Sequence, residues 1–410
     1  MLPLTEPWYR KLLWVSVVLG TVGGLVAVVY SGITGFGIDQ LFGEPTAEVW
    51  SGRWWWIPLV AAGAVIVTAL RSAWKVPEEV PGAIAMARSG WVDPNGAPAL
   101  VMVSAVSLLV GASLGPSFGI VVAGAGLGAW VVRRFGLEEE HGVDFSVAGM
   151  AGSLGGVFSA PLFGSILASE LSPLPKQSYV ASFMSQFTAA TFGYVVFFGI
   201  TGTVMLDAFG VDGYAYKNVH LLYAVGLGLA SVALLLVLAV IQALVKRVFA
   251  PITNRFVRGG IAGAAIGAIA FALPLTATGG SKQLAFATSN IGSIGIAMLV
   301  VVLIGKMFAM VLSSEAGFLG GTVFPILFLG GSAGIVVHGV FDSVPAALAV
   351  AAMIAAVPGG IIGAPVSFAL IGAAGVGVGA AGIAPIGIAI ITSHITVSAI
   401  RIARKASSTL

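Results

Sequence analysis

Two glycine-rich breaks interrupt the apolar stretch from Gly111 to Glu170, and each break runs directly into another apolar helix. The first is Gly111–Ser117, with the sequence GASLGPS, and the second is Gly155–Pro161, with the sequence GGVFSAP. A proline at a helix start is favourable because its missing N–H group would have no partner there. A helix that begins inside an apolar region directs unpaired N–H groups and a positive dipole end at whatever lies ahead. The pattern therefore indicates helix ends arranged around a small anion.

The same order of breaks returns in the second half of the chain. Gly320–Pro325 precedes one apolar helix, and Gly363–Pro365 precedes another. Broken apolar helices at matching places in two halves are typical of inverted-repeat membrane transporters, which bind their substrate between the repeats. We therefore expect one transmembrane domain over residues 1–410, made of two inverted halves at about 1–215 and 216–410.

The composition places most of this domain in a membrane. Hydrophobic residues make up 58% of the 410 residues and charged residues only 9%, against about 25% charged in ordinary soluble proteins. The first apolar run, from Trp8 to about Phe36, is longer than the apolar core of a secretory signal, so we interpret it as a membrane helix. The absence of cysteine excludes disulfides and thiolate sites. A net charge of only +3 does not indicate a nucleic-acid partner.

Basic residues cluster at five places that can lie on one side of a membrane. Cytoplasmic loops of membrane proteins carry an excess of Lys and Arg, so we predict that these clusters and both termini lie in the cytoplasm, with the protein in the plasma membrane. The acidic residues Glu44, Glu48, Asp207 and Asp212 would then lie outside. The basic clusters are Arg10–Lys11, Arg71–Lys75, Arg133–Arg134, Lys246–Arg258 and Arg401–Lys405.

Enzyme motifs are missing from this sequence. It has no HExxH zinc motif, no phosphate-binding P-loop and no Ser/His/Asp grouping of a catalytic kind, and we predict no enzyme activity, no metal and no cofactor. An intramembrane aspartyl protease needs two aspartates that share a site on spanning helices. Here every aspartate falls in a predicted loop: Asp39, Asp93, Asp144, Asp207, Asp212 and Asp342.

The order of the motifs resembles that of the CLC family of chloride channels and chloride/proton antiporters. Gly115-Pro116 is similar to the end of the family's G-[KR]-E-G-P motif. The sequence FSAPLFG at Phe158–Gly164, continuing to Glu170, is similar to the family's F-N-A-P-L-A-G…E-E segment. The stretch Lys306–Pro325 resembles a lysine-led helix that ends in G-x-F-x-P, and Ala364-Pro365 resembles the later A-P-L-T motif.

The resemblance implies an all-α polytopic membrane protein, an inverted repeat of tilted, broken and re-entrant helices. It also implies a homodimer in the lipid bilayer, with a pathway in each subunit for a small inorganic anion such as chloride. The anion would be bound by the backbone N–H groups of Thr322 and Val323, together with those around Gly115 and Ser117. Such groups hold an anion without a fixed cation in its path, so the ion can also leave.

Two departures from the family's motifs concern proton coupling. The glutamate that gates the pathway in the family is replaced by Leu114, and the inner proton glutamate of the antiporters is replaced by Leu171. A leucine cannot carry a proton or enter the site in place of an anion. We therefore predict passive, channel-like anion conduction. A secondary transporter coupled through Glu170 or Glu78, and a non-conducting relative, are the alternatives.

Two further departures concern the side chains that bind the anion in the family. The family's G-S-G-I-P motif is replaced by the sequence PEEVP at Pro77–Pro81. Matching Pro81 to the motif's proline puts Glu78 at the position of the serine ligand, whereas matching Pro77 puts Trp74 there. The serine is missing in both registers. The family's late tyrosine also has no counterpart after His394.

Several charged residues within or beside apolar helices have competing interpretations. A carboxylate inside a membrane is costly, so Glu170 either serves the inner pathway or has a structural role, capping a backbone or pairing with a lysine. For Lys306 we favour a role in pairing or in the fold over one in the anion pathway. For Glu315 we favour hydrogen bonds to backbone N–H groups. For Glu78 and Glu79 we favour a solvated pair over a cation site.

Overall fold

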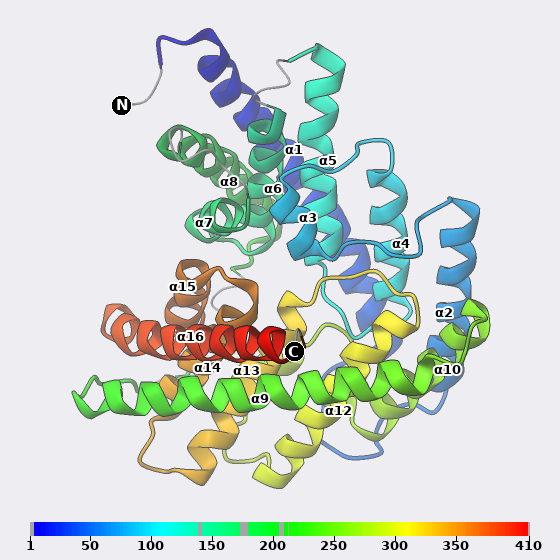
Figure 1. The fold of residues 1–410 in the computed structure, drawn as a ribbon, viewed down its shortest axis with the longest axis vertical. Helices are drawn as coiled ribbons and strands as arrows, with labels where there is room; N and C mark the ends of the chain where they lie inside the picture. Colours follow the sequence, from blue (N-terminus) through cyan, green and yellow to red (C-terminus); the bar gives the residue numbers. More distant parts are fainter. Residues whose placement is uncertain (1–3, 138–141, 173–178, 205–208, 212, 409–410) are drawn as a thin grey trace.

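The computed structural model describes residues 4–137, 142–172, 179–204, 209–211 and 213–408, and Figure 1 shows its fold. These residues confirm the predicted all-α architecture, because they form sixteen α-helices and two short 3₁₀ helices and no sheet. The α-helices are α1 (Pro7–Phe42), α2 (Trp56–Ala73), α3 (Ala83–Ser89), α4 (Ala97–Leu109), α5 (Ser117–Phe135), α6 (Gly142–Val157), α7 (Pro161–Leu171), α8 (Tyr179–Thr201), α9 (Val219–Phe249), α10 (Arg255–Ala272), α11 (Ser281–Ser289), α12 (Ile296–Glu315), α13 (Val323–Val340), α14 (Ala346–Ile362), α15 (Pro365–Val376) and α16 (Ile383–Ser408).

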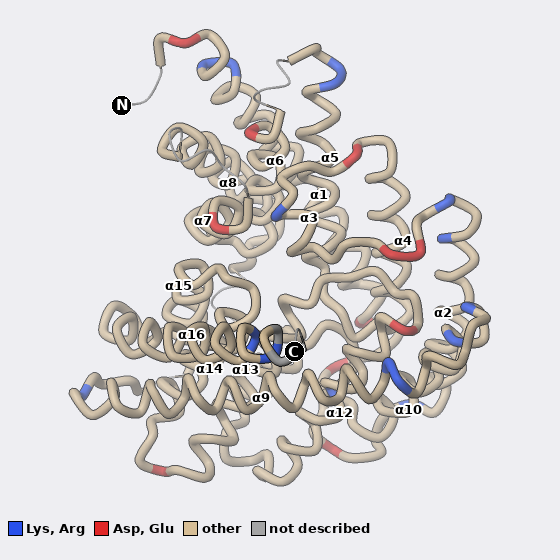
Figure 2. Tube along the Cα trace, viewed as in Figure 1, with Lys and Arg blue, Asp and Glu red and all other residues tan. Residues whose placement is uncertain are grey.

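Nine helical segments of the described chain are long and apolar enough to cross a membrane. The charged residues lie mostly at helix ends and in the connecting segments, as Figure 2 shows. Four further apolar helices, α4, α7, α14 and α15, are too short to cross on their own. The chain is therefore an integral membrane protein that combines full spans with broken helices.

The helices on either side of residues 202–218 correspond in order and in packing. Among the described residues, each half has eight α-helices. In the first half α1, α5, α7 and α8 pack on α6, and in the second half α9, α13, α15 and α16 pack on α14. Most of the first-half helices lie in the upper part of Figure 1, and helices α9 and α13–α16 lie below them. We infer from this correspondence that the two halves are structural repeats.

Glycine lets the central helix of the first half pack backbone against backbone. A Cβ atom on Gly193 of α8 would lie 2.0 Å from the carbonyl oxygen of Gly152 in α6, closer than any side chain permits. Small residues at helix contacts are typical of membrane proteins, in which close packing rather than the hydrophobic effect drives association. The core of the first half is therefore built on close contact between helix backbones.

The prediction that all aspartates lie in loops is wrong for two of them. Helix α1 continues beyond the predicted end at Phe36 to Phe42, so Asp39 lies in its last turn. Asp144 lies in the first turn of α6, is buried, and accepts a hydrogen bond of 2.6 Å from the Ser182 hydroxyl. A helix N-terminus stabilises a carboxylate there through its N–H groups and dipole. Asp207 and Asp212 lie outside the described residues.

Candidate functional site

The glycine-rich breaks of the two halves meet and pair through their backbones. The Gly115 N–H donates to the Gly321 carbonyl at 2.7 Å, and the Gly321 N–H donates to the Gly115 carbonyl at 2.8 Å. This antiparallel bridge joins the segment ahead of α5 to the segment ahead of α13. The N-termini of the two helices are therefore held beside each other, as the sequence predicts for repeats that share one site.

Unpaired N–H groups remain at both of these helix starts. In the described part of the chain, the N–H groups of Thr322, Val323 and Phe324 have no hydrogen-bond acceptor, and neither do those of Ser117 and Phe118. Buried backbone N–H groups are rarely left without a partner in proteins, so such a cluster indicates a ligand or water. The predicted Gly115 N–H is not among them, because it donates to Gly321.

The hydroxyl group of Ser117 adds a further unpaired donor. Ser117 is only 2% exposed, and its Oγ has no hydrogen-bond partner. It lies against Gly321, since a Cβ atom there would be 1.7 Å from this Oγ and 2.9 Å from the Phe118 nitrogen. Backbone and side-chain donors from both halves therefore converge, and together they match the chemistry of a small anion.

Three aromatic rings, two from the first turns of α13 and α7 and one from the residue after α6, pack together beside the start of α13. Phe324 of α13 stacks on Phe158 with ring centroids 5.2 Å apart, and Phe158 contacts Phe163 of α7 edge-on at 4.5 Å. All three rings are almost fully buried. Apolar surroundings of this kind strengthen the electrostatic attraction that N–H groups exert on a negative charge.

Leu114, three residues before Ser117 in the chain, lines a cavity of about 180 Å³. Leu114 is 4% exposed, and Pro116 lines the same cavity. Lys282 and Asp39 line the same cavity and form an ion pair of 2.6 Å that is about half exposed. An ion entering from this cavity therefore meets an aliphatic side chain where the family's gating glutamate would stand.

Lys306 is fully buried and donates hydrogen bonds to the segment between α10 and α11. Its Nζ donates to the carbonyl of Thr276 at 3.1 Å and to the carbonyl of Thr278, and it lies 5.5 Å from the ring centroid of Phe328. Thr278 has a left-handed backbone with φ of 54°. Among the described residues, no carboxylate pairs with this lysine. These contacts support the structural role favoured from the sequence.

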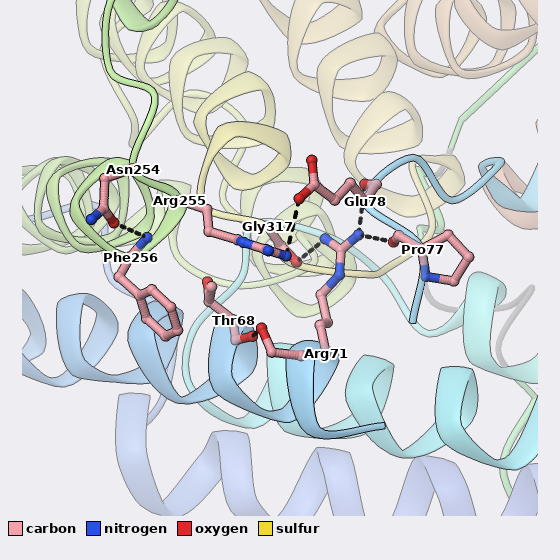
Figure 3. A network of polar contacts seen from close by, with 9 residues as sticks. Thr68, Arg71, Pro77, Glu78, Asn254, Arg255, Phe256 and Gly317 are labelled. Atoms are coloured by element: carbon pink, nitrogen blue, oxygen red, sulfur yellow. Dashed lines mark hydrogen bonds and ion pairs between the residues drawn. The ribbon is translucent and has the colours of Figure 1, made fainter. Parts of the chain in front are cut away.

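A second polar site lies at the C-terminal end of α2, around Arg71, and contains Glu78. Arg71 donates to three carbonyl oxygens, those of Gly317 at 2.9 Å, Pro77 at 2.6 Å and Glu78 at 2.7 Å. The Glu78 carboxylate is 73% exposed and pairs with Arg255 at 3.1 Å. Figure 3 shows Arg71 reaching from α2 to these backbone groups. Glu78 is thus paired with an arginine distant in sequence, rather than with Arg71 or Lys75.

Glu315 belongs to the same site and differs from its predicted role. Its carboxylate forms an ion pair of 3.1 Å with Arg258 instead of accepting from backbone N–H groups. The site encloses a cavity of about 130 Å³, whose lining includes Arg71, Arg255 and Arg258 as well as the two carboxylates. Arginines from α2 and α10 therefore hold the segment that leads to α13. These contacts join residues that are distant in sequence, so no sequence motif indicates them.

We predict that Arg71→Met lowers the free energy of unfolding by about 1–3 kcal/mol, because hydrogen bonds from a charged donor to three carbonyls are lost together. Thermal unfolding of the purified protein in detergent measures the change. Arg134→Met is the matched control, since this arginine is exposed and makes no hydrogen bond or ion pair among the described residues. Equal melting temperatures for the Arg71 and Arg134 variants would contradict the bracing role.

Glu170 caps the start of α15, a helix other than α5 and α13. Its two carboxylate oxygens accept from the N–H groups of Val366 and Ser367, each at 2.9 Å, and from the Ser367 hydroxyl at 2.6 Å. Leu171, which follows it, is 9% exposed. Of the two roles left open for Glu170, these contacts favour the capping one.

Comparison with known proteins agrees with the motifs and with the fold. The model of the family described as voltage gated chloride channel matches residues 59–398. The fold is similar to the crystal structure of a slow cyanobacterial Cl⁻/H⁺ antiporter, with a TM-score of 0.80, 16% sequence identity, and coverage of 96% of this chain and 95% of that one. It is also similar to a CLC-type fluoride/proton antiporter, with a TM-score of 0.73, 19% identity, and coverage of 94% and 95%.

Relatives found by sequence are also named as ion-transport proteins, and they match a smaller part of the chain. The protein named "Putative ion-transport protein YfeO" in Salmonella newport (strain SL254) is 26% identical over 271 residues. The match spans 64% of this chain and 64% of that protein, which is less than two thirds of its length. The family model spans most of the chain, and the structural likeness spans nearly all of it. The chain therefore belongs to the voltage-gated chloride channel family, the CLC family of membrane anion transport proteins.

Proposed function

We propose that this protein conducts small inorganic anions such as chloride passively across the membrane. The observation that carries the proposal is Leu114, an aliphatic side chain that lines a cavity and directly precedes, in sequence, the helix start with unpaired N–H groups. A gate that carries no proton cannot exchange one for an anion. The donors that we assign to the anion are the N–H groups of Thr322 and Val323 and the N–H and hydroxyl groups of Ser117.

Three observations on other residues support a pathway without proton transfer. Leu171 is aliphatic, so this chain has no titratable group at the position that matches the inner proton glutamate of the antiporters. Glu170 is held by hydrogen bonds to α15. Glu78 is paired with Arg255 at an exposed site. Neither carboxylate is placed as a mobile proton carrier between the two ends of the pathway.

The similar structures are antiporters of chloride and of fluoride, and this favours a halide as the conducted ion. We also propose a homodimer in the plasma membrane, with both termini in the cytoplasm, as the family resemblance and the basic clusters predict. Proton-coupled transport, the activity of those similar proteins, is the competing function.

Electrogenic anion efflux from liposomes tests the proposal. Liposomes with purified protein are loaded with potassium chloride, diluted into impermeant anion, and opened to potassium with valinomycin. We expect rapid chloride efflux that requires valinomycin, because a passive anion current needs a compensating cation. Nitrate and fluoride are tested in the same way to rank the ions. Absence of efflux for all three anions, from protein that is folded, would overturn the proposal.

A further inference from the structure

The break between α14 and α15 is held by two opposite charges from the other half of the chain. Arg88 of α3 donates to the carbonyl of Ile362 at 2.6 Å, at the last residue of α14. Glu170 of α7 accepts from Val366 and Ser367 at the first turn of α15. Only a short left-handed turn through Gly363, with φ of 73°, separates the two contacts.

The sign of each charge matches the helix end that it touches. The C-terminus of a helix presents unpaired carbonyl groups and a partial negative charge, and the N-terminus presents unpaired N–H groups and a partial positive charge. Arg88 therefore stabilises the end of α14, and Glu170 stabilises the start of α15. Because Pro365 has no N–H, Val366 and Ser367 carry the first free donors of α15, and Glu170 binds both of them.

The two charged residues come from elements that are themselves joined. The Ser172 hydroxyl, directly after α7, donates to the carbonyl of Ala87 in α3 at 3.2 Å. Helices α3 and α7 also pack against each other, and α7 packs against α15. Arg88 and Glu170 therefore belong to one packed unit of the first half, and they hold the break of the second half from one side.

The arrangement has no counterpart in the other half, although the breaks correspond. Glu170 follows Pro161 at the start of α7, and the residue at the same distance after Pro365 in α15 is Ala374. In the described chain the N–H groups of Leu162 and Phe163 at the start of α7 donate to no carboxylate. A carboxylate therefore caps the start of α15 but not the equivalent start of α7. The repeated fold does not by itself require such a cap.

We propose that Arg88 and Glu170 form a charge-matched clamp on the α14–α15 break, in which the Glu170 carboxylate is the resident anion of the α15 N-terminus. Glu170 is then a positioning residue: it fixes α15 against α7 and keeps transported anions away from this helix start. The proposal rests on these contacts alone and holds whether transport is passive or coupled.

Chemical rescue with a small carboxylate tests the clamp. In Glu170→Ala the donors of Val366, Ser367 and the Ser367 hydroxyl lose their acceptor, so we expect a lower melting temperature in detergent. Added formate should then raise the melting temperature of this variant markedly more than that of the wild type, because formate can occupy the vacated position. Glu79→Ala is the matched control, since Glu79 is exposed and unpaired among the described residues. A variant as stable as the wild type, or one insensitive to formate, would overturn the clamp.

A second set of variants covers the case in which Glu170→Ala does not fold. Glu170→Gln retains one acceptor oxygen and adds a donor that faces N–H groups, so we expect an intermediate loss of stability. Arg88→Ala should lower stability too, and the double variant should lose less than the sum of the single losses, because the two residues hold one break. Additive losses would count against a joint clamp. A proton carrier at Glu170 predicts the opposite pattern: unchanged stability of Glu170→Gln with loss of a proton flux that the wild type shows.

Discussion

Leu114→Glu is expected to make anion flux strongly dependent on pH. The new carboxylate would stand beside the unpaired N–H groups of Ser117 and Phe118 and would occupy them as an anion. At neutral pH we expect at least about a tenfold loss of flux, which corresponds to roughly 1.4 kcal/mol of competition for the donors. Flux should return only as the pH falls below about 4.3, the ordinary pKa of a glutamate, because the N–H donors favour the charged form and protonation removes the charge.

Leu114→Gln separates charge from shape in this experiment. Glutamine has nearly the same size as glutamate and does not titrate between pH 3 and 8, so its flux should be independent of pH. The measurement is chloride efflux from liposomes over this pH range for the wild type and both variants. Flux of Leu114→Glu that does not change with pH would show that Leu114 does not lie at the gate position.

Gly321→Ala is expected to disrupt the anion donors directly. A Cβ atom on Gly321 would lie 1.7 Å from the Ser117 Oγ and 2.9 Å from the Phe118 nitrogen, so a side chain must move the start of α5 or of α13. Forced overpacking of this kind costs about 1–3 kcal/mol, which is enough to lower flux by about tenfold or more if the donors lose their alignment. Chloride efflux per folded protein measures the loss.

Two companion variants define what the loss means. Gly32→Ala is the control, since a Cβ atom there meets nothing within 4 Å. Ser117→Gly combined with Gly321→Ala removes the nearest clash and should recover part of the folding stability, though the backbone contact with Phe118 remains. Wild-type flux in Gly321→Ala would mean that the paired breaks do not form the anion site.

The sequence predicted the fold because its strongest signals are local. Proline at a helix start and glycine ahead of it determine where α7 and α15 begin, and both begin at the predicted residues. The repeated order of these breaks also predicts that the N-termini of α5 and α13 meet. What motifs do not display is which donors stay free: the Gly115 N–H is used in the bridge to Gly321, whereas the Ser117 Oγ is unpaired.

The roles of the charged residues depend on partners far away in the chain. Glu78 pairs with Arg255, Glu315 with Arg258, and Glu170 with the start of α15. Each of these contacts joins segments separated by tens to hundreds of residues, and no local spacing indicates them. A single sequence therefore shows that a membrane carboxylate needs a partner, whereas the folded chain is needed to identify that partner.

Proton movement driven by an anion gradient tests the central claim most directly. Liposomes that contain the purified protein are given an inward chloride gradient with internal pH recorded, and the membrane potential is clamped with potassium and valinomycin. An antiporter of the kind found among the similar structures uses the chloride gradient to move protons uphill. We predict chloride flux with no uphill proton movement in the wild type. Proton movement in fixed proportion to chloride would contradict passive conduction and would require a coupling route that bypasses Leu114 and Leu171.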